Sequence, residues 1–183
     1  GITNVLNTGC PSTWNLTPDH LAQVPSTKSD NVVFTLTDYS PDLIQDADFV
    51  NLLLSRYSKV YFWPQGIGDE DYFRKLQGKN ITVLPPNLAA FDELLGSDQP
   101  LDYVGTRLHA GIRALQHQRR TICIAVDSRA KEIHNDIGLQ VVDRGQIDFL
   151  DFLIGSAWDT ELEIDFESIS RWKRQFESPC GAH

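Results

Sequence analysis

The chain has 183 residues, of which 41% are hydrophobic and 22% are charged, and this balance suits a folded domain with a core of its own. Its formal net charge of -9 disfavours a general nucleic-acid surface, because contacts with phosphates require clustered lysine and arginine. No apolar run approaches the roughly 20 residues that a membrane-spanning helix needs. No basic start followed by an apolar stretch marks a signal peptide.

The three cysteines, Cys10, Cys123 and Cys180, are widely spaced and form no C-x-x-C motif. This pattern favours a reducing compartment over a disulfide scaffold, and we expect a cytoplasmic location. The chain contains no methionine and begins with glycine. We therefore expect a processed or truncated piece of a longer protein, from which part of the functional protein is missing.

The start of the chain is rich in turn-forming glycine and proline, and we expect residues 1–30 to be a leading segment or the remnant of an N-terminal domain. Within it, Thr17 is placed to cap a short helix that begins at Pro18. A β-branched, apolar run over residues 31–37 then predicts the first strand.

The next helix is expected to follow Ser40 as its N-cap, with Pro41 in the first turn. Its apolar residues recur at steps of four and three, which predicts one face packed on the core. That face carries Leu43, Ala47, Val50, Leu54 and Tyr57.

The rest of the chain keeps alternating between strands and helices. Strands are expected over residues 59–64, 81–84, 101–104, 121–126 and 139–142. Helices are expected over residues 69–76, 88–95, 108–115, 130–137, 147–154 and 162–176, with Asn87 and Ser128 as N-caps and Gly96 and Gly138 at C-terminal ends.

Six strands separated by helices require a parallel sheet with right-handed crossovers. We therefore predict a Rossmann-like α/β domain over residues 31–155, with helices on both faces of a six-stranded sheet. Residues 156–183 are expected to form a C-terminal helical extension. One residue marks each predicted strand, in the order Val33, Val60, Val83, Val104, Ile124 and Val141.

An arginine and a histidine, Arg107 and His109, lie where a predicted strand feeds a helix. In an open α/β sheet this edge is where ligands bind, and the N–H groups of a helix N-terminus attract phosphate. Arginine can grip phosphate or carboxylate with two hydrogen bonds, and histidine can donate a proton near neutral pH. Either side chain could instead serve the turn alone, Arg107 by bonding a carbonyl and His109 by capping or packing.

Several features between Asp102 and Arg144 form one recognisable pattern. They are the turn G-T-R-L-H-A at residues 105–110, Ala-Leu near the end of the next helix, and a buried strand closing at Asp127 before S-R-A-K-E-I. Together they resemble the polysaccharide pyruvyl transferase family. Weaker similarities to that family run over residues 4–11 and 32–66.

The resemblance implies an enzyme of polysaccharide synthesis that transfers pyruvyl from phosphoenolpyruvate to two hydroxyls of a sugar, forming a ketal. It implies that His109 is the general acid and that Arg107 holds the phosphate or carboxylate of the donor. Phosphoenolpyruvate is then a substrate, no cofactor is required, and the partners are a small-molecule donor and a saccharide acceptor. Family members pair two Rossmann-like domains in a glycosyltransferase-B arrangement, of which this chain would hold the C-terminal half and be inactive alone.

One anchor seen in the family is absent, because an arginine often follows the first strand there in a Ser-x-Arg pattern. This chain instead has Thr-Leu-Thr-Asp over residues 35–38. Further substrate-binding candidates at the same predicted edge are Thr106, Gln65 and Asp127, of which Asp127 could bind a ligand hydroxyl or pair with Arg129. No spacing of histidine, cysteine and acidic residues predicts a metal site.

Two other functions stay open. A glycosyltransferase-B-like domain would bind a nucleotide sugar, and a non-catalytic binding domain would have kept the fold after losing the site. The missing arginine favours the non-catalytic reading, and competing titrations with phosphoenolpyruvate and nucleotide sugars would separate the two enzymes.

Overall fold

The protein is built on a six-stranded, all-parallel sheet in the order β3-β2-β1-β4-β5-β6, in a computed structural model that describes residues 5–76 and 79–177. The strands are β1 (Asn31–Thr35), β2 (Lys59–Phe62), β3 (Ile81–Val83), β4 (Leu101–Gly105), β5 (Thr121–Ala125) and β6 (Val141–Asp143). Every residue predicted to mark a strand lies in the expected one, which confirms the Rossmann-like sheet. The strand order reverses between β1 and β4, the position at which such folds bind ligands.

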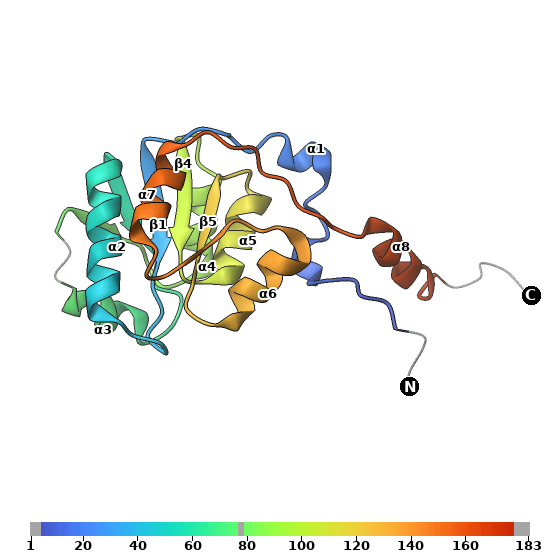
Figure 1. Cartoon of the computed structure of the whole chain (residues 1–183), viewed down its shortest axis with the longest axis horizontal. Helices are drawn as coiled ribbons and strands as arrows, with labels where there is room; N and C mark the ends of the chain where they lie inside the picture. Colours follow the sequence, from blue (N-terminus) through green and yellow to red (C-terminus); the bar gives the residue numbers. More distant parts are fainter. Residues whose placement is uncertain (1–4, 77–78, 178–183) are drawn as a thin grey trace, which may run out of the picture.

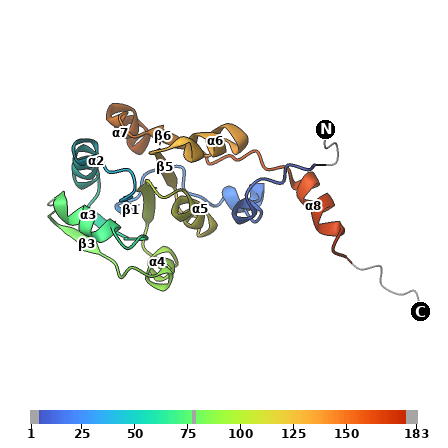
Figure 2. The ribbon, with the colours of Figure 1, turned by 90° about the horizontal axis from the view of Figure 1, so that it is seen from below.

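Helices cover both faces of this sheet (Figures 1 and 2). On one face lie α2 (Leu43–Arg56), α3 (Asp69–Lys75) and α7 (Ile147–Gly155), and on the other lie α4 (Leu88–Leu95), α5 (Leu108–Gln116) and α6 (Ser128–Ile137). The turn η1 (Pro11–Thr13) and α1 (Pro18–Leu21) precede the sheet, and α8 (Phe166–Arg174) follows it.

Two hydrophobic cores result, because successive side chains of a strand point to opposite faces of the sheet. In β1, Val32 and Phe34 belong to the core beneath α2, whereas Val33 belongs to the core beneath α5. Every residue of β1, β4 and β5 is buried, as expected of central parallel strands. A ligand can therefore reach the middle of the sheet only at the strand ends.

Helix α2 differs from its prediction in both its start and its buried face. Its N-cap is Asp42 rather than Ser40, because the Asp42 carboxylate accepts hydrogen bonds from two N–H groups of the first turn. Asp46 also turns inward, because Arg144 donates hydrogen bonds of 2.9 and 2.8 Å to it, and this rotates the helix so that Leu43 is half exposed. The buried face is Asp46, Phe49, Val50 and Leu53.

Most other predicted helix ends are confirmed. Thr17 and Asn87 cap α1 and α4, and Gly138 ends α6 in the left-handed conformation at φ 76°. The prediction for the start of α6 is wrong, since Asp127 and not Ser128 accepts the capping hydrogen bond, from the N–H of Arg129 at 2.9 Å. A carboxylate one residue earlier thus takes the capping role.

The C-terminal helix is shorter than predicted. Residues 157–165 form neither helix nor strand, and within them Leu162 and Ile164 pack on the core beneath α5. Figure 1 shows α8 standing away from the sheet beside the N-terminal segment, where the rings of Trp14 and Trp172 meet at 5.2 Å.

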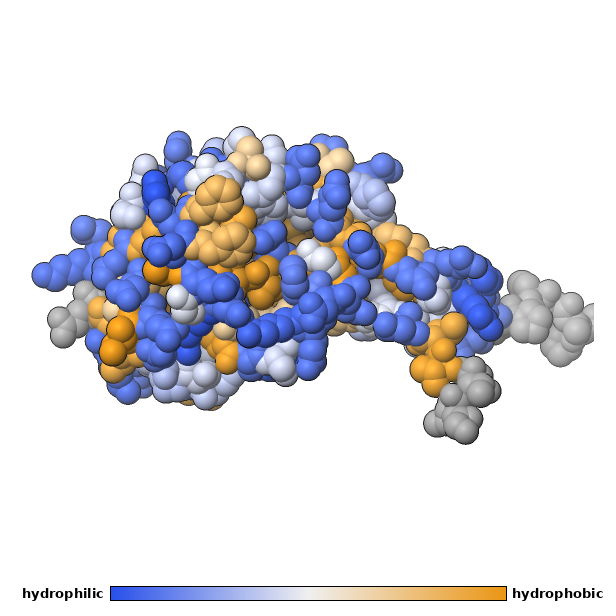
Figure 3. Space-filling view, viewed as in Figure 1, coloured by the Kyte–Doolittle hydropathy of each residue, from blue (hydrophilic) through white to orange (hydrophobic). Residues whose placement is uncertain are grey.

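The surface is largely hydrophilic on the face drawn in Figure 3, with an apolar area over α7. Two exposed aromatic residues of α7, Phe149 and Phe152, stack there with their ring centroids 6.4 Å apart. No helix in the described part of the chain is long and apolar enough to cross a membrane.

Candidate functional site

A cavity of about 120 Å³ lies at the carboxyl edge of the sheet, close to the point where the strand order reverses. Its lining includes all five predicted site residues, namely Gln65, Thr106, Arg107, His109 and Asp127, together with Tyr39 and Arg129. These residues follow β1, β2, β4 and β5, whose carboxyl ends meet because the strands are parallel. Thr37, at the end of the first predicted strand, does not line the cavity: it is fully buried, and its hydroxyl has no partner within the described residues.

The N-terminus of α5 opens onto this cavity. Arg107 is the N-cap in an extended conformation, and no side chain of the described residues caps the first turn. Two side-chain hydroxyls hold the backbone of Arg107 instead, since the Arg107 N–H donates to the Thr35 hydroxyl at 3.1 Å and the Tyr103 hydroxyl donates to the Arg107 carbonyl at 2.8 Å. The first-turn N–H groups are thus left facing a small polar cavity, an arrangement suited to an anion.

The Arg107 side chain is engaged by acidic residues. Its Nη2 donates to the Asp69 carboxylate, which is fully buried, and lies 3.4 Å from Asp38. Asp69 also accepts hydrogen bonds from the backbone N–H groups of Asp38, Gln65 and Gly66, at 3.1, 3.1 and 2.6 Å. Removing one partner of a buried ion pair costs about 3–5 kcal/mol, so Arg107 is held firmly in this network.

The sequence predicted Asp69 only as the first residue of the helix over residues 69–76, and its contacts with three loops were not predicted. The sequence signal is the run Gln65–Asp69, in which an aspartate follows a glycine turn and can fold back on the turn's N–H groups. Gly66 fits this arrangement because a Cβ there would lie 2.7 Å from the Arg107 Nη2. The loop after β2 is therefore shaped around the Arg107–Asp69 pair.

A second cation, Arg129, lies in the same cavity and was not among the predicted site residues. Its Nε and Nη2 donate to Asp127 at 3.0 and 2.6 Å, and its Nη2 also donates to the Tyr39 hydroxyl at 2.7 Å. The side chain is 66% exposed, against 17% for Arg107. Exposed ion pairs contribute only about 0.2–1 kcal/mol, so Arg129 can change partners far more easily than Arg107.

Asp127 is occupied by protein groups on both oxygens. It accepts from Arg129 and from the Tyr39 hydroxyl, the latter at 3.1 Å, and it caps α6. Hydrogen bonds from Arg129 lower the pKa of Asp127 from its ordinary value. Of the two roles considered for Asp127, the structure displays the pairing with Arg129. Tyr39 lies between two guanidinium groups, with its ring centroid 5.3 Å from Arg107 and 5.5 Å from Arg129.

His109 lies in the first turn of α5 with an exposed ring. Its Nε2 is 3.7 Å from the Cys10 sulfur, which in turn lies 3.0 Å from the Ser12 hydroxyl. His109 also borders a neighbouring hollow of about 430 Å³, lined by Cys10, Arg129, Glu132 and other residues. Sequence reasoning could not pair Cys10 with His109, because they lie 99 residues apart. The third cysteine, Cys180, lies outside the described residues.

The other buried charges of the protein are structural. Arg120, which follows α5, is buried and donates to the carbonyls of Leu153 and Ser156 at 2.7 and 2.9 Å. It also lies 3.4 Å from Asp102, whose pKa is raised by burial. This cluster ties α7 to the sheet and has no place in the cavity.

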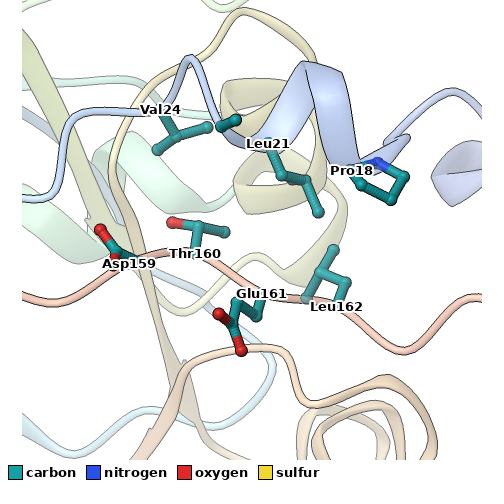
Figure 4. Close-up of a pocket in the computed structure, with 8 residues that line it drawn as sticks. Pro18, Leu21, Val24, Asp159, Thr160, Glu161 and Leu162 are labelled. Atoms are coloured by element: carbon teal, nitrogen blue, oxygen red, sulfur yellow. The ribbon is translucent and has the colours of Figure 1, made fainter.

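A larger hollow of about 510 Å³ lies between α1 and the extended segment after α7 (Figure 4). Its labelled residues include two acids, Asp159 and Glu161, beside aliphatic side chains such as Leu21 and Val24. Neither histidine, cysteine nor any basic residue lines it. It lacks the histidine and the arginines that the smaller cavity offers to an anion.

No group of three or more histidine, cysteine or acidic side chains is placed to hold a metal ion within residues 5–76 and 79–177. Comparison with known proteins finds no family model that matches the chain and no curated protein similar to it. The function is therefore inferred from the chemistry of the cavity and from the motif around His109.

Proposed function

We propose that this domain belongs to a pyruvyl transferase that uses phosphoenolpyruvate as donor and a saccharide as acceptor. The observation that carries the proposal is the meeting of His109 and two arginines, Arg107 and Arg129, at the uncapped N-terminus of α5. An exposed proton donor beside anion-binding groups is what this reaction requires. We still expect a second domain in a glycosyltransferase-B arrangement. A cytoplasmic location also remains a prediction.

In the proposed reaction, His109 donates a proton to the methylene carbon of phosphoenolpyruvate, and positive charge develops on the adjacent carbon. One sugar hydroxyl adds to that carbon and returns a proton to His109. The second hydroxyl then displaces the phosphate, which leaves with the electrons of the carbon–oxygen bond and takes up the proton of that hydroxyl. The products are a cyclic ketal and inorganic phosphate. The helix N-terminus and the cavity arginines hold the anionic groups throughout.

The size of the cavity favours a small donor over a nucleotide sugar. Sites for drug-sized ligands usually measure about 300–1,000 Å³, whereas this cavity measures about 120 Å³. Its lining is dominated by hydrogen-bonding and charged groups rather than by an apolar wall that could hold a base. A three-carbon phosphate ester suits these dimensions and this polarity better.

Titration calorimetry on the 183-residue chain tests the donor, with phosphoenolpyruvate, inorganic phosphate and UDP-glucose as separate ligands. We expect phosphoenolpyruvate to bind with the tightest affinity, phosphate more weakly and UDP-glucose not at all. Tight binding of UDP-glucose with no response to phosphoenolpyruvate would replace this proposal with a nucleotide-sugar enzyme. Binding is the readout because it does not require the acceptor.

A non-catalytic binding domain is the second candidate, and one observation favours it. The segment after β1, where family members often have an arginine, has none here; its Asp38 lies against Arg107, and Asp69 holds the same guanidinium. Two carboxylates thus reduce the positive charge offered to a donor. This candidate predicts that the chain binds inorganic phosphate and phosphoenolpyruvate with equal affinity, and that His109 contributes nothing to that affinity.

A further inference from the structure

We propose that Arg129 binds the anionic donor, by exchanging Asp127 for the ligand. The inference rests on the proposed function, because it takes the ligand of the cavity to be an anion. It adds a second arginine, outside the R-L-H motif, to the donor site that the motif suggests. Three observations support it.

The first observation is that Arg129 can leave Asp127 without depriving its carboxylate of all hydrogen bonds. Asp127 keeps two other hydrogen bonds, from the Arg129 backbone N–H at 2.9 Å and from the Tyr39 hydroxyl at 3.1 Å. Most of the Arg129 side chain is in solvent, so its guanidinium can move without disturbing the core. The exchange replaces one charge-assisted pair by another.

The second observation is that Arg107 cannot make the same exchange. Its partner Asp69 is fully buried and would be left with an uncompensated charge inside the protein. Asp38 lies on the same guanidinium and would repel an arriving phosphate. The Nη2 of Arg107 therefore stays on Asp69 and fixes the loops after β1 and β2 against α5, so the exchange of partners falls to Arg129. The Nε of Arg107 is buried and has no partner among the described residues.

The third observation is the position of Arg129 relative to the reacting group. Arg129, His109 and Leu108 line both the small cavity and the neighbouring hollow, so they stand at the boundary between the two. A carboxylate or phosphate gripped there lies beside the first turn of α5 and beside the proposed general acid. The Nε and Nη2 of Arg129 already donate hydrogen bonds to the carboxylate of Asp127. The carboxylate or phosphate of phosphoenolpyruvate would accept the same kind of charge-assisted hydrogen bonds.

The test measures phosphate and phosphoenolpyruvate affinity by calorimetry for four variants of the full chain. Arg129→Gln should weaken binding by at least about tenfold, since it removes a charge-assisted pair of hydrogen bonds. Asp127→Asn should tighten binding several-fold, because it releases Arg129 while asparagine still caps α6. Arg74→Gln removes an equal charge from an exposed arginine of α3 paired with Glu70, and it should leave affinity unchanged.

The fourth variant distinguishes direct binding of the ligand by Arg129 from repulsion of the ligand by Asp127. Arg129→Gln also exposes the Asp127 charge, which could repel the ligand even if Arg129 never touched it. In the double variant Arg129→Gln with Asp127→Asn, binding should stay weak if Arg129 grips the donor. Recovery of wild-type affinity in the double variant would overturn the inference, as would wild-type affinity in Arg129→Gln alone. A wild-type chain that binds neither phosphate nor phosphoenolpyruvate would overturn the proposed function as well.

Discussion

Replacing Arg107 by glutamine should destabilise the fold rather than act mainly on ligand affinity. The change leaves the buried Asp69 carboxylate without its cationic partner. Breaking a buried ion pair costs about 3–5 kcal/mol. Asp69 retains three backbone N–H donors, from Asp38, Gln65 and Gly66, so we expect a loss near the lower end, about 3 kcal/mol.

Urea unfolding followed by circular dichroism measures this loss directly. With a urea slope of about 2–3 kcal/mol per molar, the midpoint of the Arg107→Gln variant should fall by roughly 1 M. Arg129→Gln is the matched control, because it removes the same charge from an exposed pair worth at most about 1 kcal/mol. Because both arginines line the same cavity, the difference between the two losses of stability reports the effect of burial.

A double-mutant cycle identifies the partner. The double variant Arg107→Gln with Asp69→Asn should lose less stability than the sum of the two single changes, with a coupling free energy of at least about 1 kcal/mol. A coupling free energy near zero, or a loss for Arg107→Gln no larger than for Arg129→Gln, would refute the reasoning. Arg107 would then be free to serve the ligand as the motif suggests.

Three further predictions concern packing, acid stability and catalysis. Gly111→Ala should lower stability by about 1–3 kcal/mol through overpacking, because the new Cβ would lie 2.5 Å from the Cys123 sulfur; a rise in melting temperature would contradict this. Hydrogen bonds from Arg113 lower the pKa of Asp92 below its unfolded value of 3.8, so the pair stabilises the fold above pH 3.8 and this contribution is lost as pH falls through the folded pKa. Asp92→Asn should therefore lower stability at neutral pH and flatten its fall in acid, whereas an unchanged acid limb in urea titrations would argue against the pair. In an active preparation with both domains, His109→Gln should reduce turnover by about 10²–10⁴-fold while keeping donor affinity, because glutamine cannot donate the proton; near-normal turnover would refute the acid assignment.

Local sequence patterns determined the course of the chain and the edge of the sheet at which a site could form. β-branched runs and helical spacing predicted all six strands, and the signal is clearest in β1, β4 and β5, which are buried throughout. Local capping chemistry predicted the roles of Thr17, Asn87 and Gly138, because a cap depends on residues next to the helix end. Because parallel strands end at one edge, the predicted site residues were also brought to one cavity.

Tertiary structure alone decided which charged side chains pair, and hence which of them remain available to a ligand. The buried face of α2 was mispredicted because Asp46 is drawn inward by Arg144, 98 residues away. In the same way, the buried Asp69 holds Arg107 from 38 residues away, whereas Arg129 stays in solvent beside Asp127. An ion pair between distant residues leaves no periodic trace in a sequence, because its stability depends on burial and geometry that exist only once the chain has folded.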